Sequence, residues 1–404
     1  MTRIAVVDVG TTAWTGGGAY AVVSAQSLVA ATTPGDEVMW VGRRPDHSPA
    51  GTAAVPVADV QQLPGERALR RRLGLTDRAL TFPGESRLRR TAHLPQPHDP
   101  VWVAARKGAD VVFPVTAMSQ PASGTMAYVG WIPDFQHVTN AEHFSVTEIA
   151  ARDQASRLLA RNAHVVVLSS EAALAEFVRF SPEYADKARV LRFPSRYAFD
   201  DVDDLLDPSE TAKRYHVPER YLLCANQFWT HKNHVMLVEA VALLAKEGMR
   251  VPVVMTGMLA DYRDPSNSLV STMLQIVATS GVHDLVRVLG LVPRADLEGL
   301  LRNAAGVVQP SASEGWNTTV QDALALGRPL ICSDLPVHRE QAPDAEFFDL
   351  TASGLATAIR RMWADGTARS KPLEDSLEDE RLRARQHGSA LMRACRDAVE
   401  RARR

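Results

Sequence analysis

The sequence has few cysteines and no long apolar run. Three cysteines occur in 404 residues, at Cys224, Cys332 and Cys395, far apart and without a C-x-x-C pair. This argues against a disulfide framework or a zinc site and indicates a reducing compartment. No window of about 18 apolar residues is present, so no transmembrane helix is expected. Met1 leads straight into a strand-like stretch and not into a signal peptide, so we expect a cytoplasmic protein.

The chain also lacks a strong charge of either sign. Its net charge of -2 gives no overall attraction to nucleic acid, so no nucleic-acid partner is expected. Arginines do cluster at residues 67–72, 87–90 and 381–404. These clusters lack the interleaved aromatics of an amphipathic anchor and are interpreted as solvated helix faces, with weak contact to an anionic membrane surface left open.

The length and the apolar pattern predict two α/β domains. A chain of 404 residues exceeds one ordinary core. Nearly continuous apolar runs typical of parallel strands alternate with helical segments such as 235–247 and 320–326. The runs are residues 4–9, 38–41, 111–113, 165–168, 221–224, 251–255, 287–289, 306–308 and 329–332.

The domain limits follow from a pause in this pattern. Residues 197–218 hold five aspartates and two prolines and are interpreted as a linker. The predicted domains are 1–204 and 205–385, followed by a C-terminal helix at 386–404 that packs back toward the first domain. The tail from Glu380 is predicted to form one or two helices.

A glycine-rich turn follows the first strand. Gly16, Gly17 and Gly18 precede a predicted helix at 19–30. Glycines let backbone N–H groups approach a phosphate at a helix N-terminus. The spacing does not match G-x-G-x-x-G, so a dinucleotide fingerprint is not supported, and a plain flexible loop remains an equal alternative.

The sharper signal lies in the second half, where a buried strand ends at Pro310 and a helix is predicted to start near Thr318. Thr318 or Thr319 suits its first turn, and the free N–H groups there form an anion site. Glu314 precedes that site and Asp322 lies about one turn inside the helix. A carboxylate beside a phosphate repels it, so Glu314 is interpreted as an acceptor for sugar hydroxyls. A capped helix with two surface acids is the alternative.

Lys232 is the second element. It follows the predicted strand at 221–224, at the edge where ligands of parallel sheets bind, and would act as a point charge on phosphate oxygens. Standing alone, it would be interpreted as a solvated lysine.

Together these segments resemble the retaining glycosyltransferases of family GT4, which have the GT-B fold. Three stretches carry the resemblance: residues 289–293, the Glu314-x7-Asp322 form of the family's E-x7-E motif, and residues 327–340. A W-I-P-D-F-Q-H stretch at 131–137 resembles a sub-branch of these enzymes. The resemblance implies two Rossmann-like domains whose parallel sheets face each other across a cleft.

The resemblance also implies roles. Glu314 would contact the donor sugar, Asp322 the ribose hydroxyls and Lys232 the diphosphate leaving group. Asp134 and His137 would be catalytic groups of the first domain. The remaining substrate-binding residues would be Gly16, Gly17, Gly18, Gln227, Leu291, Val292, Gly315, Trp316, Asn317, Thr318 and Thr319.

Four positions depart from the family pattern. Gln227 stands where the family has an arginine. One of the positive charges that would contact the leaving group is therefore missing. Asp322 is one methylene shorter than the usual glutamate. Pro133 occupies the place of the family's histidine, and His137 is offset from it, so a capping or core role for His137 is an equal alternative.

The implied reaction is retaining transfer of a hexose from a nucleotide-diphosphate sugar to an acceptor hydroxyl, without cofactor or metal. Asp201-Val202-Asp203 resembles a metal-binding D-x-D but falls in the predicted linker. A small molecule or a glycan is the expected acceptor, in secondary-metabolite or polysaccharide synthesis, and the composition suggests a high-GC bacterial source. The alternatives are a phosphorylase, a nucleotide-sugar hydrolase or epimerase, and a sugar-nucleotide-binding protein with weak or no catalysis.

Overall fold

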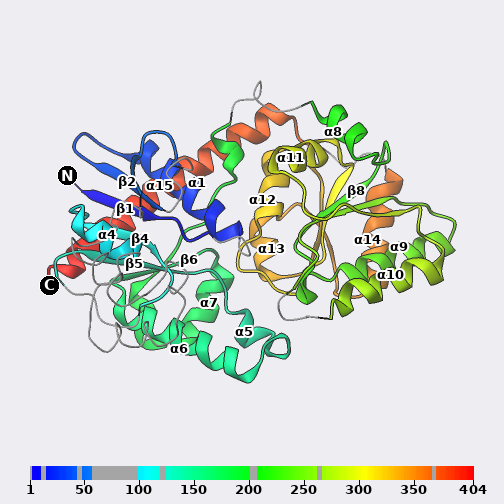
Figure 1. Cartoon of the computed structure of the whole chain (residues 1–404). Helices are drawn as coiled ribbons and strands as arrows, with labels where there is room; N and C mark the ends of the chain where they lie inside the picture. Colours follow the sequence, from blue (N-terminus) through cyan, green and yellow to red (C-terminus); the bar gives the residue numbers. More distant parts are fainter. Residues whose placement is uncertain are drawn as a thin grey trace, which may run out of the picture. The chain divides into compact units, whose positions relative to one another are not determined.

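The computed structural model describes residues 2–10, 15–42, 48–56, 99–118, 124–200, 207–261, 266–365 and 370–404. These residues form two parallel β-sheets with flanking helices (Figure 1). Contacts divide the chain into a first unit of residues 1–131, 157–167 and 385–404 and a second unit of residues 132–156 and 168–384.

The strands are β1 (Arg3–Val7), β2 (Glu37–Gly42), β3 (Ala53–Pro56), β4 (Val111–Val115), β5 (Ala127–Ile132), β6 (Val165–Leu168), β7 (Ala188–Val190), β8 (Leu222–Ala225), β9 (Val253–Thr256), β10 (Val286–Val288), β11 (Gly306–Gln309), β12 (Leu330–Ser333) and β13 (Glu346–Phe348). The α-helices are α1 (Thr15–Ala31), α4 (Pro100–Arg106), α5 (Gln136–Thr139), α6 (Val146–Asn162), α7 (Glu171–Phe180), α8 (Pro208–Arg214), α9 (His234–Lys246), α10 (Ser268–Ser280), α11 (Arg294–Asn303), α12 (Thr318–Ala325), α13 (Pro336–Gln341), α14 (Ala352–Asp365) and α15 (Leu373–Ala402). Short 3₁₀ helices are η4 (Ala141–His143), η5 (Pro182–Lys187), η6 (Arg196–Ala198) and η8 (Thr230–Lys232).

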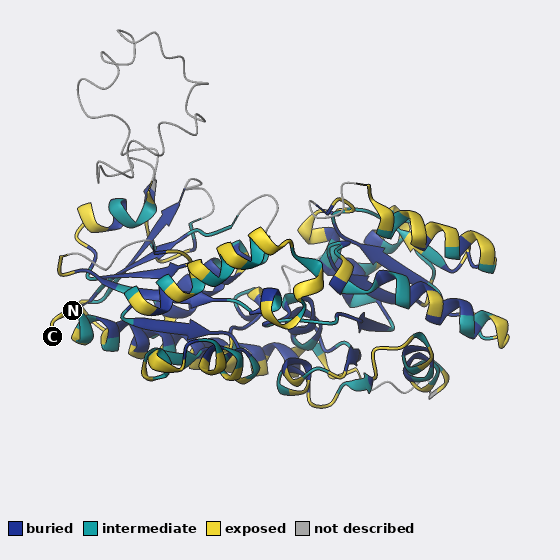
Figure 2. Cartoon of the chain, turned by 90° about the horizontal axis from the view of Figure 1, so that it is seen from below, coloured by how far each residue is buried: buried dark blue, intermediate teal, exposed yellow. Residues whose placement is uncertain are grey.

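The first sheet has the strand order β3-β2-β1-β4-β5-β6-β7. β1 pairs in parallel with β2 and β4, and β4 pairs in parallel with β5. Strands β1, β2, β4, β5 and β6 are mostly buried, as Figure 2 shows, because apolar side chains on both of their faces are covered by helices. The parallel sheets predicted from continuous apolar runs are confirmed, although β3, β5, β7 and β13 were not among the predicted strands.

The second sheet has the order β10-β9-β8-β11-β12-β13, with parallel pairing throughout. One core cluster packs α9, α10 and α14 onto this sheet, with Leu237, Val277 and Ile359 among its members. A second cluster packs α11 and α12 onto the sheet, with Leu300 and Val320 among its members. This arrangement leaves the carboxyl ends of β8 and β11 side by side, since β11 pairs directly with β8.

The predicted linker is partly a helix. Asp207 caps α8 by accepting a hydrogen bond from the Ser209 N–H at 2.9 Å, and Pro208 fits the first helical position. α8 packs on α11 so closely that a Cβ at Gly299 would lie 2.3 Å from Thr211 Oγ1. The linker interpretation was therefore wrong for residues 207–214. The predicted boundary at 204 and the D-x-D stretch at 201–203 lie outside the described residues.

The C-terminal segment is one long helix, α15, which begins at Leu373 and not near residue 380. Its residues 385–404 belong to the first unit. There Ser24 Oγ lies 3.2 Å from His387 Nε2, and Arg396 donates to Asp36 at 3.0 Å. A Cβ at Gly388 would lie 2.0 Å from the Ser27 carbonyl oxygen, so only glycine allows this close approach.

The glycine-rich segment of the first unit is helical. Helix α1 begins at Thr15, so Gly16, Gly17 and Gly18 lie in its first turn and not in a loop before a helix at residue 19. A Cβ at Gly10 would lie 2.7 Å from the Gly18 Cα. Because Gly10 and Gly18 have no side chains, the segment that follows β1 can pass directly against the first turn of α1.

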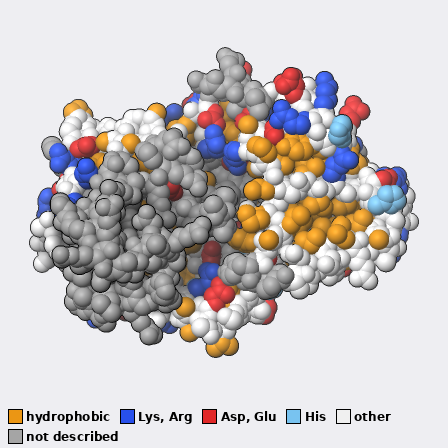
Figure 3. Space-filling model, viewed as in Figure 1, with side chains coloured by type: hydrophobic (Ala, Val, Ile, Leu, Met, Phe, Trp, Pro, Cys, Tyr) orange, Lys and Arg blue, Asp and Glu red, His pale blue; other side chains and the backbone are white. Residues whose placement is uncertain are grey.

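The surface of the second unit exposes apolar side chains (Figure 3). Leu291 is 64% exposed, Leu274 54% and Leu259 39%. Across the described part of the chain, no helix combines the length and the hydropathy needed to cross a membrane. The arginine clusters at 67–72 and 87–90 lie outside the described residues.

Candidate functional site

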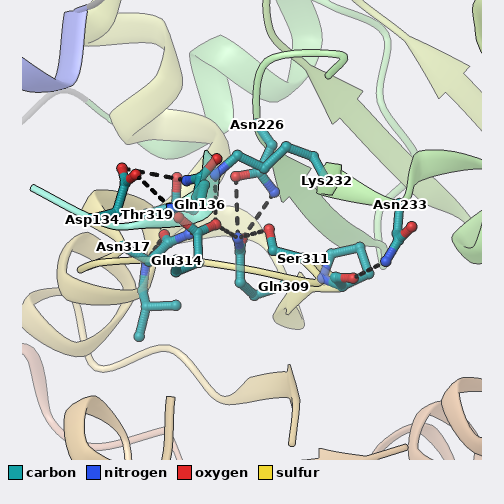
Figure 4. A network of polar contacts seen from close by, with 12 residues as sticks. Asp134, Gln136, Asn226, Lys232, Asn233, Gln309, Ser311, Glu314, Asn317 and Thr319 are labelled. Atoms are coloured by element: carbon teal, nitrogen blue, oxygen red, sulfur yellow. Dashed lines mark hydrogen bonds and ion pairs between the residues drawn. The ribbon is translucent and has the colours of Figure 1, made fainter. Parts of the chain in front are cut away.

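The candidate site forms in the second unit, where β8 and β11 end and α12 begins (Figure 4). Ligands of open parallel sheets bind at such carboxyl edges, because the connecting loops there carry polar groups that the buried strands cannot. The loop after β8 contributes Asn226 and Lys232, and the end of β11 with its following loop contributes Gln309 and Glu314.

Lys232 and Glu314 meet directly. Lys232 Nζ lies 2.5 Å from Glu314 Oε1, and the two side chains are 11% and 6% exposed. Burial raises the pKa of Glu314, but the Lys232 ammonium, with His231 nearby, outweighs burial and lowers the pKa to about 2. Glu314 is therefore a carboxylate at neutral pH, which accepts hydrogen bonds and has no proton to give.

Two amides also donate to the same carboxylate oxygen. Gln309 Nε2 lies 3.0 Å and Asn317 Nδ2 2.8 Å from Glu314 Oε1. Asn226 in turn donates from Nδ2 to Gln309 Oε1 at 2.9 Å. Three donors thus converge on Oε1, while Oε2 has no hydrogen bond among the described residues and can accept one from a bound molecule.

The N-terminus of α12 lies beside this carboxylate. Asn317 caps the helix by accepting from the Val320 N–H at 2.9 Å, so the capping side chain precedes both threonines that sequence reasoning singled out. Thr319 Oγ1 donates to the Ala225 carbonyl at 2.7 Å and ties the helix start to β8. The backbone N–H groups of Thr318 and Thr319 make no hydrogen bond within the described part of the chain, so they are available to an anion.

Gly315 brings a second loop against the site. A Cβ at Gly315 would lie 1.8 Å from the Pro133 carbonyl oxygen and 2.9 Å from Asp134 Cβ, so no other residue fits there. Asp134 Oδ1 accepts from the Gln136 N–H at 3.1 Å. Burial raises the pKa of Asp134, and the nearby Glu314 carboxylate adds to the rise. The Asp134 and Glu314 carboxyl groups are thus neighbours, and a catalytic role for Asp134 stays a prediction.

Another carboxyl group beside Asp134 was missed by sequence reasoning. Burial, reinforced by the Asp134 carboxylate, raises the pKa of Glu176 in α7 to about 7. No motif marks Glu176, which looks like any surface glutamate of an amphipathic helix.

His137 has a separate set of neighbours. Its ring is buried and lies near the rings of Phe135 and Phe180, with centroids 6.1 and 6.2 Å away. Its Nε2 lies 3.1 Å from Asp153 Oδ1. Burial lowers the pKa of His137, against the effect of Asp153. These contacts match the core role weighed from the sequence, and a catalytic role for His137 stays a prediction.

Asp322 is buried in α12 and both of its oxygens are engaged. Ser195 Oγ donates to Oδ1 at 2.6 Å, and Arg294 donates to Oδ2 at 2.6 Å. The Arg294 guanidinium lies 5.4 Å from the centre of the Tyr197 ring, and its side chain is 40% exposed. A ribose bound here would therefore meet Arg294 as well as Asp322. Sequence reasoning missed Ser195 and Arg294, because nothing in the chain marks their distant pairing.

The other predicted binding residues take up varied positions. Gln227 Oε1 accepts from the Met258 N–H at 2.8 Å, which holds this side chain against the loop after β9. Leu291 is exposed while Val292 is buried. Trp316 Nε1 donates to the Phe193 carbonyl at 3.1 Å. Gly16, Gly17 and Gly18 belong to the first unit, and their role in substrate binding stays a prediction. Among the described residues, no group of three or more His, Cys, Asp or Glu side chains is arranged to hold a metal ion.

Part of the chain matches a known family and a curated relative. Residues 210–378 match the family model described as glycosyl transferases group 1. O-antigen chain mannosyltransferase B of Escherichia coli is 31% identical over 126 residues. That alignment covers 31% of this chain and 31% of the mannosyltransferase, so less than a third of the relative's length is matched.

Solved structures resemble the chain over nearly its whole length. Sucrose-phosphate synthase of Thermosynechococcus elongatus has a TM-score of 0.65 at 16% identity, over 97% of both chains. HepE of Anabaena, solved with UDP and glucose, has a TM-score of 0.60 at 16% identity, also over 97% of both chains. A glycosyltransferase of Rickettsia africae has a TM-score of 0.63 at 12% identity, over 100% of this chain and 98% of that one. The chain therefore has the GT-B fold, and its residues 210–378 match the glycosyl transferases group 1 family.

Proposed function

We propose that the protein transfers a hexose from a nucleotide-diphosphate sugar to an acceptor hydroxyl, with retention of the anomeric configuration, as GT4 enzymes do. The observation that carries the proposal is the contact of Lys232 Nζ with Glu314 Oε1 beside the N-terminus of α12. A cation and free N–H groups suit a diphosphate, and a carboxylate oxygen without a partner suits a sugar hydroxyl.

These groups support a nucleotide sugar as the donor. Lys232 has three N–H donors and, among the described residues, only Glu314 takes one, so two can bind phosphate oxygens. Glu314 Oε2 would accept from a hydroxyl of the transferred sugar. The matched family, the name of the E. coli mannosyltransferase and the solved complexes of HepE with UDP and UDP-glucose support a nucleotide sugar as the donor.

The nucleoside would lie toward α11. Asp322 and Arg294 present a carboxylate and a guanidinium that can bind ribose hydroxyls, and the backbone near Leu291 and Val292 would meet the base. Arg294 also supplies a cation in a site where Gln227 replaces the family's arginine.

The reaction would proceed on one face of the sugar. The bond from the anomeric carbon to the phosphate oxygen breaks and its electron pair stays on the diphosphate. The acceptor oxygen forms the new bond on the same face, and its proton passes to the departing diphosphate oxygen. Lys232 and the Thr318 and Thr319 N–H groups stabilise the growing negative charge. No metal is included in this scheme, and EDTA is expected to leave turnover unchanged.

Gln227 favours a second candidate, a sugar-nucleotide-binding protein with little catalysis. Its carbonyl is engaged by the Met258 N–H, and an amide cannot replace the charge of an arginine. Such a protein would bind nucleotide sugars and give no turnover with any acceptor. A hydrolase or phosphorylase would release nucleotide without an acceptor hydroxyl.

The test has two stages. A thermal-shift screen with UDP, GDP, dTDP and ADP identifies the base, because specific binding stabilises the folded state. Transfer is then followed by proton NMR of the anomeric signal with glucosyl and mannosyl donors and a panel of small-molecule and glycan acceptors. Acceptor-dependent product with the donor's configuration supports the proposal. Inversion, nucleotide release without acceptor, or binding without turnover contradicts it.

The expected location stays the cytoplasm. Cys224, Cys332 and Cys395 are all buried free thiols, which supports a reducing compartment.

A further inference from the structure

Gln309 is the centre of the polar network shown in Figure 4. It ends β11 and is fully buried. Its Nε2 lies 3.0 Å from Glu314 Oε1 and 2.8 Å from Ser311 Oγ. Its Oε1 accepts from Asn226 Nδ2 at 2.9 Å. A buried glutamine at the last position of a parallel strand, with every polar atom engaged, holds a side-chain arrangement that water cannot disturb.

The chemistry of the partners fixes the orientation of this amide. Glu314 is ionised and only accepts, so the nitrogen of Gln309 faces it. The oxygen of Gln309 then faces Asn226, whose Nδ2 is the donor. Gln309 Nε2 also lies 3.3 Å from Asn226 Oδ1, so the two amides bond each other twice. A flipped Gln309 would set its oxygen against the Glu314 carboxylate and Asn226 Oδ1, and its N–H against the Asn226 N–H, losing these bonds.

We propose that Gln309, oriented by Asn226, is the positioning residue that turns Glu314 so that Oε2 is presented to the donor sugar. The inference rests on the proposed function and adds to it a residue that no motif contains. Lys232, Gln309 and Asn317 all bind Oε1, and this shared target leaves Oε2 without a partner among the described residues.

A neutral amide suits this task. Lys232 serves two anions in the proposed reaction, and its hold on Glu314 weakens when a diphosphate shares the ammonium. The bond from Gln309 carries no net charge and stays in place through that exchange. The strand end and the Asn226 contact keep its donor at the same point before and after the donor binds.

The test compares Gln309→Met with Gln321→Met. Both glutamines are buried, and Gln321 bonds Glu380 and Gln341 without touching Glu314. We expect Gln309→Met to lower kcat about 10- to 100-fold, the effect of one hydrogen bond to a charged group. The dissociation constant of the nucleoside diphosphate should change less than about twofold, because Gln309 does not face the phosphates. Gln321→Met should keep kcat within about threefold of wild type.

Two further variants separate positioning from folding. Asn226→Leu has the shape of the native residue and removes both the donor and the acceptor that orient Gln309, so it should lower kcat like Gln309→Met. In Glu314→Gln the carboxylate is already lost, so adding Gln309→Met should lower kcat less than about threefold further.

Each outcome decides the inference. If the wild type is active and Gln309→Met and Asn226→Leu both keep kcat near the wild-type value, the inference is overturned and the proposed function is not. The inference is also overturned if Gln309→Met lowers kcat and nucleotide affinity equally, or if Gln309→Met and Gln321→Met have equal effects. In either case the Gln309 amide has only a structural role. If Gln309→Met fails to fold, the kcat of Asn226→Leu and its affinity for the nucleotide decide. Absence of transfer by the wild type refutes the proposed function, and the inference with it.

Discussion

The most direct test of the site is Lys232→Met, which removes the ammonium and keeps an apolar stem. Lys232 Nζ is 2.5 Å from Glu314 Oε1, and both side chains are nearly buried. A hydrogen bond to a charged group contributes about 1.5–3 kcal/mol to stability, and the two amides on Glu314 remain, so we expect a loss of about 2 kcal/mol. Removing a preorganised group that stabilises charge in the transition state costs about 100- to 1000-fold in kcat.

The assay measures nucleotide release at saturating donor, together with urea unfolding at neutral pH. Lys246→Met is the matched control, because Lys246 ends α9 and is exposed. The double variant Lys232→Met with Glu314→Gln removes both charges and should regain most of the stability, since no buried carboxylate is left unpaired. It should not regain turnover.

The reasoning would be refuted by a Lys232→Met enzyme whose kcat stays within about threefold of wild type. Recovery of kcat in the double variant would also refute it, because Lys232 would then act only through its pairing with Glu314 and not on the leaving group.

Four other measurements follow from the same structure. The pKa of Glu314 is lowered from 4.5 to about 2, so its contribution of roughly 3 kcal/mol is complete above about pH 4.5 and lost as pH falls toward 2; the stability gap between wild type and Glu314→Gln should close over that range in urea titrations. Burial raises the pKa of Glu380 from 4.5 to about 7, so its contribution to the free energy of unfolding is complete below about pH 4.5 and lost as pH rises through 7. Relative to wild type, Glu380→Gln should therefore gain roughly 3 kcal/mol of stability between about pH 4.5 and pH 8. A stability difference that stays constant with pH contradicts this. Gly315→Ala places a Cβ 1.8 Å from the Pro133 carbonyl and should lower both turnover and unfolding free energy, the latter by at least about 2 kcal/mol; unchanged urea midpoints count against the contact. Asp322→Asn should raise KM for the donor about tenfold with little change in kcat, whereas a fall in kcat at constant KM would assign Asp322 to the chemical step.

Local pattern was enough for most of the strands, though not for β3, β5, β7 and β13, and for the start of α12. The runs at 165–168 and 306–308 coincide closely with β6 and β11, because strands buried on both faces are continuously apolar whatever surrounds them. The helix predicted near Thr318 begins at that residue. In contrast, residues 207–214 were assigned to a linker because they contain too few apolar residues to show a helical period. The helix there is stabilised mainly by its packing on α11.

The partners of the candidate site could not be predicted in the same way. Asn226 and Gln309 meet across 83 positions of sequence, and Ser195 and Asp322 across 127. In the sequence alone, Gln309 is only a polar residue at the end of an apolar run. Its role becomes visible when strand pairing places Asn226 beside it. Long-range pairing of this kind leaves no periodicity or motif in a single chain.

The sequence by itself determined the alternation of apolar runs and helices. It placed Lys232 and Glu314 after strand ends and Asp322 inside the helix that follows. Those features depend on local hydrophobic period and on residue type. The tertiary structure decided what each group faces. In the folded chain Lys232 and Glu314 form a buried ion pair. The Asp322 oxygens accept hydrogen bonds from Ser195 and Arg294. The Gln309 amide donates to Glu314. Only parallel pairing of β8 with β11 brings these loops together, because residues far apart in the chain become neighbours through strand order.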